Sequence, residues 1–150
     1  MSRRAFLTAA GIAGFFALGG AATYFNLQKG TPATSHGSTS VAYAPGVVKE
    51  LLAANKTVFV DVYTSWCSTC TSQGRTIEVL RQENPAYDAN MVFVALDWDV
   101  YANSDFARKY RIQNRSTLLI LRGNKVLAGS YADTRYSGIK ALMDVGLAKG

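Results

Sequence analysis

The chain has 150 residues, of which 49% are hydrophobic and 17% are charged. This length and composition suffice for one hydrophobic core but not for two. The formal net charge is +6, yet nucleic-acid binding is not expected, because the basic cluster of Arg108, Lys109, Arg111 and Arg115 is best explained as a solvated face. Two cysteines and one histidine also provide too few soft ligands for a zinc site.

The first 28 residues contain a long uncharged segment behind two arginines. Ser2–Leu7 reads Ser-Arg-Arg-Ala-Phe-Leu, and no charge follows until after Gln28. The hexapeptide resembles the bacterial twin-arginine export signature. The residue after it, Thr8, departs from that signature, in which lysine is commonest at this position. Four glycines keep the segment only moderately hydrophobic, as is typical of such signals. We therefore expect export to the periplasm.

Two fates of this segment remain open. Residues 1–28 are either a cleaved twin-arginine signal peptide or a retained membrane anchor, because spanning a hydrocarbon core needs only ~20 residues. In the first case the protein is soluble in the periplasm, and in the second residues 5–28 hold it at the inner membrane. Residues 29–42 lack an apolar pattern and are predicted to be a flexible linker, in which His36 is solvated.

A single folded domain is predicted for residues 43–150. Pro45 should open its first helix, and the loop Arg122-Gly123-Asn124 is typical of a hairpin. In the helix after the cysteines, Ile77 and Leu80 should face inward, with Val79 a further candidate. The predicted strands are 58–63, 91–96, 117–121 and 125–131, and the other predicted helices are 103–110 and 135–147.

Both cysteines occur in the short motif Trp66-Cys67-Ser68-Thr69-Cys70. The predicted strand of β-branched and aromatic residues precedes the motif, and residue types that cap helices follow it. Cys67 should therefore lie between the end of a strand and the start of a helix. Backbone N–H groups and the helix dipole favour a thiolate there. We predict that Cys67 is the exposed nucleophile of low pKa, and that Cys70 is the buried thiol that resolves a mixed disulfide. A structural disulfide closing so small a loop would constrain the unfolded chain very little.

The segment Asp61–Cys70 resembles the thioredoxin superfamily motif D-F/L-W/Y-A-x-W-C-x-x-C, and the resemblance extends over roughly Thr57 to Ala148. It implies an α/β thioredoxin fold, with a central mixed β-sheet of about four to five strands flanked by helices. It also implies thiol–disulfide oxidoreductase activity with no cofactor and no metal. In the family the buried aspartate helps to move the proton of the resolving thiol and the tryptophan caps the disulfide. These roles pass by position to Asp61 and Trp66.

The resemblance fails at Ser116. The stretch Tyr110–Leu118 resembles Y-x-I-x-x-x-P-T-L, whose proline is cis and packs against the disulfide, but serine replaces that proline here. A cis bond before serine costs ~3 kcal/mol, so a trans Arg115–Ser116 bond is predicted. By position, Arg115, Ser116 and Thr117 should line the edge that binds an incoming protein chain. On this view a return to proline at Ser116 should keep the fold.

Two functions remain open. Ser68 and Thr69 include neither the histidine of strongly oxidising periplasmic enzymes nor the proline of cytosolic thioredoxins, which favours a donor of electrons. The preferred prediction is a monomeric cell-envelope oxidoreductase that reduces periplasmic protein disulfides and is recharged by a membrane reductase. In the family the proline also deters metal binding, so Ser116 supports an alternative. That alternative is a non-enzymatic CxxC metallochaperone or assembly factor that binds a metal or an iron–sulfur cluster.

Overall fold

A computed structural model describes residues 40–148, so the predicted signal or anchor and most of the predicted linker, with His36, lie outside the described residues. Within residues 40–148, no helix combines the length and apolar character needed to cross a membrane. The strands are β1 (Val41–Ala42), β2 (Thr57–Tyr63), β3 (Met91–Asp97), β4 (Thr117–Arg122) and β5 (Lys125–Tyr131). The helices are α2 (Val47–Ala53), α3 (Ser68–Glu83), α4 (Ala86–Asn90), α5 (Trp98–Tyr101), α6 (Asp105–Lys109) and α7 (Tyr136–Leu147).

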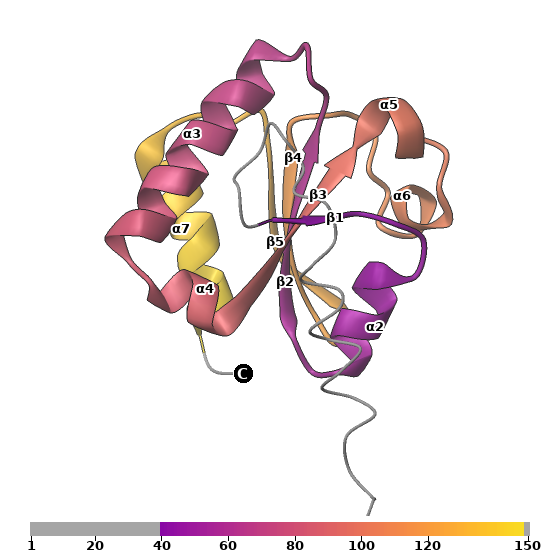
Figure 1. Cartoon of the computed structure of the whole chain (residues 1–150), viewed down its shortest axis with the longest axis horizontal. Helices are drawn as coiled ribbons and strands as arrows, with labels where there is room; N and C mark the ends of the chain where they lie inside the picture. Colours follow the sequence, from indigo (N-terminus) through magenta and orange to yellow (C-terminus); the bar gives the residue numbers. More distant parts are fainter. Residues whose placement is uncertain (1–39, 149–150) are drawn as a thin grey trace, which may run out of the picture.

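The strands form one mixed sheet in the order β1-β3-β2-β4-β5 (Figure 1). Strands β1 and β2 run parallel to β3, while β4 is antiparallel to β2 and β5 is antiparallel to β4. The hairpin between β4 and β5 turns through Gly123 and Asn124, and Gly123 takes the positive φ of 56° that such turns require. The predicted mixed α/β sheet flanked by helices is confirmed.

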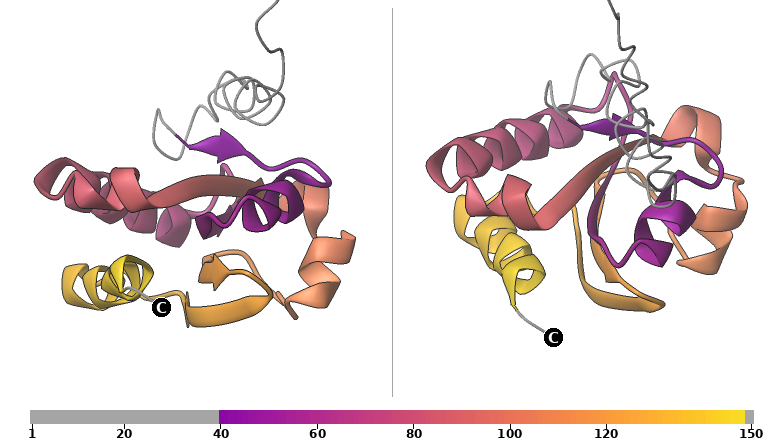
Figure 2. Two further views of the ribbon diagram at one scale, coloured as in Figure 1. Left: turned by 90° about the horizontal axis from the view of Figure 1, so that it is seen from below. Right: turned by 60° about the horizontal axis from the view of Figure 1, so that its bottom comes forward.

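Helices cover both faces of this sheet (Figures 1 and 2). Alternate residues of β2 point to opposite faces. Val58, Val60 and Val62 join the core beneath α2 and α6, whereas Phe59 joins the core beneath α3, α4 and α7. Asp61 continues the alternation of Phe59, so it belongs to the face that α3 covers. Strand β2 therefore places Asp61 and the cysteine-bearing helix on one side of the sheet.

Four details of the sequence prediction are wrong. Strand β1 (Val41–Ala42) lies inside the predicted linker, and the sequence did not indicate it because only two of its residues pair with β3, too few to show a periodic pattern. Helix α2 begins at Val47 with Gly46 as its N-cap, two residues later than the predicted start at Pro45. Val79 is 44% exposed, because Ile77 and Leu80 alone occupy the inward stripe at that turn. The short helices α4 and α5 were not anticipated.

Candidate functional site

The reactive pair lies at the start of α3. Cys67 is the N-cap of this helix, and its Sγ accepts a hydrogen bond from the backbone N–H of Cys70 at 3.1 Å. Both cysteines are free thiols. Cys70 is fully buried, and Cys67 is only 6% exposed. The expectation of an exposed Cys67 is therefore wrong, because its sulfur turns inward against the chain that precedes β4.

Ser116 provides that covering contact. Its Oγ lies 3.3 Å from Cys67 Sγ and 3.1 Å from Cys70 Sγ, within hydrogen-bond distance of both sulfurs. No cis peptide bond occurs within residues 40–148, which confirms the predicted trans bond before Ser116. Ser116 instead adopts a left-handed backbone with φ of 62°. A conformation that L-residues seldom adopt thus stands where the family has a cis proline.

Backbone hydrogen bonds hold Ser116 in this conformation. Its N–H donates to the carbonyl of Val62 at 2.7 Å, and its carbonyl accepts the N–H of Ala132 at 2.9 Å. The bond to Val62 extends the pairing of β2 with β4, and the bond from Ala132 joins the residue after β5 to Ser116. A proline could not make the first bond, because proline has no N–H.

The two thiols differ in acidity. Burial works to raise the pKa of Cys67, but hydrogen bonds from the Cys70 thiol, Ser116, the Cys70 N–H and Arg115 outweigh it and lower that pKa from 9.0 to about 7. Burial raises the pKa of Cys70, and its hydrogen bond to Cys67 raises it further. Near neutral pH, Cys67 is therefore the thiol that carries the negative charge.

An exposed rim stands beside Cys67. Trp66 is 63% exposed, and its indole N–H donates to Asp99 Oδ2 at 2.8 Å. The guanidinium of Arg115 lies 4.3 Å from the centre of the Trp66 ring, a cation–π arrangement. Arg115 thus lies against the tryptophan and is also among the groups that lower the pKa of Cys67. Thr117 starts β4 and its Oγ1 donates to the carbonyl of Asn114.

Asp61 is buried in β2, where it pairs in register with Ala95 and Leu118. It shares the sheet face of α3, whose first turn contains Cys70. Its role in moving the proton of Cys70 stays a prediction that rests on the resemblance.

Sequence reasoning missed Gln73 and Asp99. Gln73 is fully buried in α3, one turn after Cys70, and its side-chain amide donates to the carbonyls of Ser116 and Asp133. The available signal was a polar residue on an inward stripe that also contains Cys70 and Ile77. Asp99 lies in a helix too short to show a pattern.

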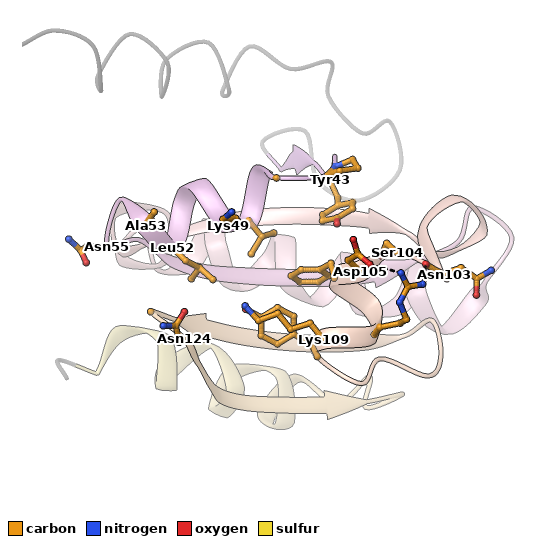
Figure 3. Close-up of a pocket in the computed structure, with 17 residues that line it drawn as sticks. Tyr43, Lys49, Leu52, Ala53, Asn55, Asn103, Ser104, Asp105, Lys109 and Asn124 are labelled. Atoms are coloured by element: carbon orange, nitrogen blue, oxygen red, sulfur yellow. Dashed lines mark hydrogen bonds and ion pairs between the residues drawn. The ribbon is translucent and has the colours of Figure 1, made fainter.

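A cavity of about 850 Å³ opens elsewhere, between α2 and α6 (Figure 3). Tyr43, Phe106 and Tyr110 contribute to its wall, and two of its charged residues, Arg108 and Asp105, pair with each other. None of the predicted site residues lines it. Within residues 40–148, no three His, Cys, Asp or Glu side chains are grouped to hold a metal ion.

Comparison with known proteins gives consistent matches. The Thioredoxin family model matches residues 43–144. A thioredoxin from Chlorobaculum thiosulfatiphilum is 35% identical over 78 residues, which cover 52% of this chain and 68% of that protein. Thioredoxin C-2 from Corynebacterium nephridii is 30% identical over 95 residues, which cover 63% of this chain and 83% of that protein.

Solved structures agree on the fold. Trxlp from Edwardsiella tarda has a TM-score of 0.59 at 24% identity, over 67% of this chain and 95% of its own. A thioredoxin from Malassezia sympodialis has a TM-score of 0.60 at 20% identity, over 71% of this chain and 92% of its own. The family match and the Cys-x-x-Cys pair support thiol–disulfide oxidoreductase activity in general, and the chain belongs to the thioredoxin family.

Proposed function

We propose that this protein reduces disulfide bonds of other proteins in the bacterial cell envelope, with Cys67 as the nucleophile and Cys70 as the resolving thiol. The difference between the two thiols carries the proposal. Cys67 Sγ accepts a backbone N–H and has a pKa of about 7, whereas burial raises the pKa of Cys70. Because a thiolate attacks a disulfide and a thiol does not, the first attack comes from Cys67.

The reaction then proceeds by two exchanges. The Cys67 thiolate attacks one sulfur of the partner's disulfide, so a Cys67–partner bond forms, the partner's S–S bond breaks, and its second sulfur leaves as a thiolate that takes up a proton. Cys70 next loses its proton and attacks Cys67 Sγ, which expels the partner's first sulfur as a thiolate. Two electrons have passed to the partner, and Cys67 and Cys70 are left as a disulfide.

A second dithiol protein must return those electrons. We assign this step to a membrane thiol reductase, since the segment that resembles a twin-arginine signal favours the envelope as the place of action. The exposed rim of Trp66 and Arg115 beside the nucleophile supports a protein substrate, since it offers a contact surface next to the reacting sulfur. The chain 115–117 at the same rim is where a partner backbone would lie.

The test is reduction of a disulfide-bonded model protein, insulin, with dithiothreitol as electron donor. The wild-type protein should accelerate insulin reduction, and Cys67→Ser should abolish the acceleration. In a separate incubation without dithiothreitol, pre-reduced Cys70→Ala should accumulate a mixed disulfide with insulin, which added dithiothreitol then releases. The double variant Cys67→Ser/Cys70→Ala should form none. Failure of the wild type to accelerate reduction, or trapping that persists without Cys67, would overturn the proposal.

The alternative, a CxxC protein that holds a metal or cluster, draws on one observation, the serine at position 116. Titration of free thiols together with metal analysis of freshly purified protein separates the two. Two titratable thiols per chain with no metal support the oxidoreductase. Blocked thiols with metal in a fixed ratio to protein support the alternative.

A further inference from the structure

A buried amide next to the reactive pair lies outside the exchange chemistry. Gln73 is fully buried in α3, and its Nε2 reaches the chain segment that covers the two sulfurs. We propose that Gln73 is a positioning residue that holds the Ser116 hydroxyl between Cys67 and Cys70. The inference rests on the proposed role of Cys67 as nucleophile and identifies what sets the reactivity of that thiol.

The hydrogen bonds of Gln73 fix the orientation of its side chain. Its Nε2 donates to the carbonyl of Ser116 and to the carbonyl of Asp133, each at 3.1 Å. A carbonyl only accepts hydrogen bonds, so the NH₂ group must face both of them. One side chain of α3 thus joins the segment before β4 to the segment after β5.

The cost of burying this amide favours a specific role. No group in the described part of the chain donates to Gln73 Oε1, although that atom is buried. A buried acceptor without a donor destabilises the folded state, and an apolar side chain of equal length would avoid the cost. Packing alone therefore does not explain a glutamine at this position, whereas its two donated bonds do.

Ser116 needs such an anchor because its conformation is unfavourable. A serine with φ of 62° stays left-handed only where its surroundings hold it. Val62 and Ala132 hold its backbone from the sheet and from the neighbouring segment. Gln73 holds it from α3, the helix that begins at the two cysteines. The bond from Gln73 therefore ties the Ser116 backbone to the helix that begins at the cysteines, in addition to the contacts of its hydroxyl with the two sulfurs.

The position of the Ser116 hydroxyl relative to the two sulfurs matters because a hydroxyl has only one proton to donate. Ser116 Oγ lies 3.3 Å from Cys67 Sγ, and its hydrogen bond is among the causes that lower the pKa of Cys67. A small shift of the segment would weaken this bond without changing Cys67 itself. Loss of the anchor should then make the Cys67 thiolate less stable, and the effect should require the Ser116 hydroxyl.

A double-mutant cycle tests this dependence. The rate of Cys67 alkylation by iodoacetamide is measured from pH 5 to pH 10 on reduced protein, with the label located by mass spectrometry. Gln73→Met keeps the length and packing of the side chain and removes both donors. Ser116→Ala should raise the pKa of Cys67 by about one unit, as loss of a hydrogen bond to a charged group predicts. Gln73→Met should raise it by at least half as much.

The combined variant decides the mechanism. In the Ser116→Ala background, Gln73→Met should raise the pKa of Cys67 no further, because the hydroxyl that it positions is gone. Gln82→Met is the matched control, since Gln82 is exposed on the same helix and its side chain bonds only to Glu78 among the described residues. That control should leave the profile unchanged. An unchanged pKa in Gln73→Met, or an equal rise with and without Ser116, would overturn the proposal.

Two further outcomes are also informative. If Gln73→Met fails to fold, as seen by circular dichroism, Gln73→Asn takes its place, because it keeps an amide but is one carbon too short to reach both carbonyls. Gln73→Asn should also raise the pKa of Cys67, and a wild-type value would overturn the inference. Alkylation requires no partner protein, so failure of the insulin assay with an intact cycle would reject the proposed function and leave the positioning role standing.

Discussion

Restoring the family proline at position 116 should destabilise this protein, although the sequence alone suggests that the fold would tolerate it. Proline fixes φ near −65° and has no N–H. Ser116 has φ of 62°, and its N–H donates to the carbonyl of Val62 at 2.7 Å. Ser116→Pro therefore removes a hydrogen bond at the end of β2 and forces the backbone out of its left-handed conformation.

The size of the effect follows from those two losses. A buried carbonyl left without its donor costs ~1–3 kcal/mol, and the incompatible φ adds more. Moving the Ser116 backbone also strains the bonds that its carbonyl accepts from Ala132 and Gln73. We expect a loss of at least ~3 kcal/mol in the free energy of unfolding, a fall in Tm of roughly 12 °C for a domain of this size.

Ser116→Gly is the matched control for the backbone. Glycine accepts a positive φ at no steric cost and keeps the N–H, so relief of ~1–2 kcal/mol of strain is offset by the entropy that glycine loses on folding. Thermal denaturation of the reduced proteins should place Ser116→Gly within a few degrees of the wild type. A Tm for Ser116→Pro at or above that of Ser116→Gly would refute the reasoning.

Four further predictions concern reactivity, stability and export. Cys67 should be alkylated before Cys70, with a midpoint near pH 7, and faster labelling of Cys70 would contradict the assignment. The same thiols should shape the stability of the reduced protein in urea. This stability should rise with pH from about 7, because the folded pKa of Cys67 is lowered to about 7. It should fall again above about pH 9, where Cys70 loses its proton in the unfolded chain but keeps it in the folded protein, since its folded pKa is raised. Arg115→Ala should raise the pKa of Cys67 by a few tenths of a unit in the alkylation profile, because a partly exposed guanidinium stabilises a thiolate only weakly; no change would remove Arg115 from the site. Changing Arg3 and Arg4 together to lysine should retain the protein in the cytoplasm of a fractionated cell, because that export route reads the arginine pair and not charge alone, and normal export of the variant would reject the twin-arginine interpretation.

Local patterns in the sequence were sufficient to predict the centre of the fold. The β-branched run of β2 and the capping residues after Cys67 predict a strand, a turn and a helix from neighbouring residues alone. Part of the difference in acidity between Cys67 and Cys70 follows from the same local arrangement, since Cys67 is the helix N-cap and the thiol and N–H of Cys70 both bond to it. The short elements α4, α5 and β1 were missed because two to five residues carry no detectable period.

The anchor around Ser116 could not be predicted in this way. Its left-handed backbone depends on bonds to Val62, Ala132 and Gln73, and Gln73 is 43 residues away in the chain. The sequence shows that a proline is missing but not what replaces it. Likewise, the inward turn of the Cys67 sulfur depends on the Ser116 hydroxyl, so exposure could not be deduced from the motif.

In this chain the segment that covers the two cysteine sulfurs is fixed by hydrogen bonds to Ser116, and not by the cis proline of the family. A proline ring would present an apolar surface to the two sulfurs, whereas Ser116 presents a hydroxyl within hydrogen-bond distance of both. The ionisation of Cys67 then depends on a donor that lies outside the Cys-x-x-Cys motif and is held by a glutamine on the next turn of the same helix. Substitutions at Gln73 or Ser116 should therefore tune the reactivity of the pair while its four-residue motif stays unchanged.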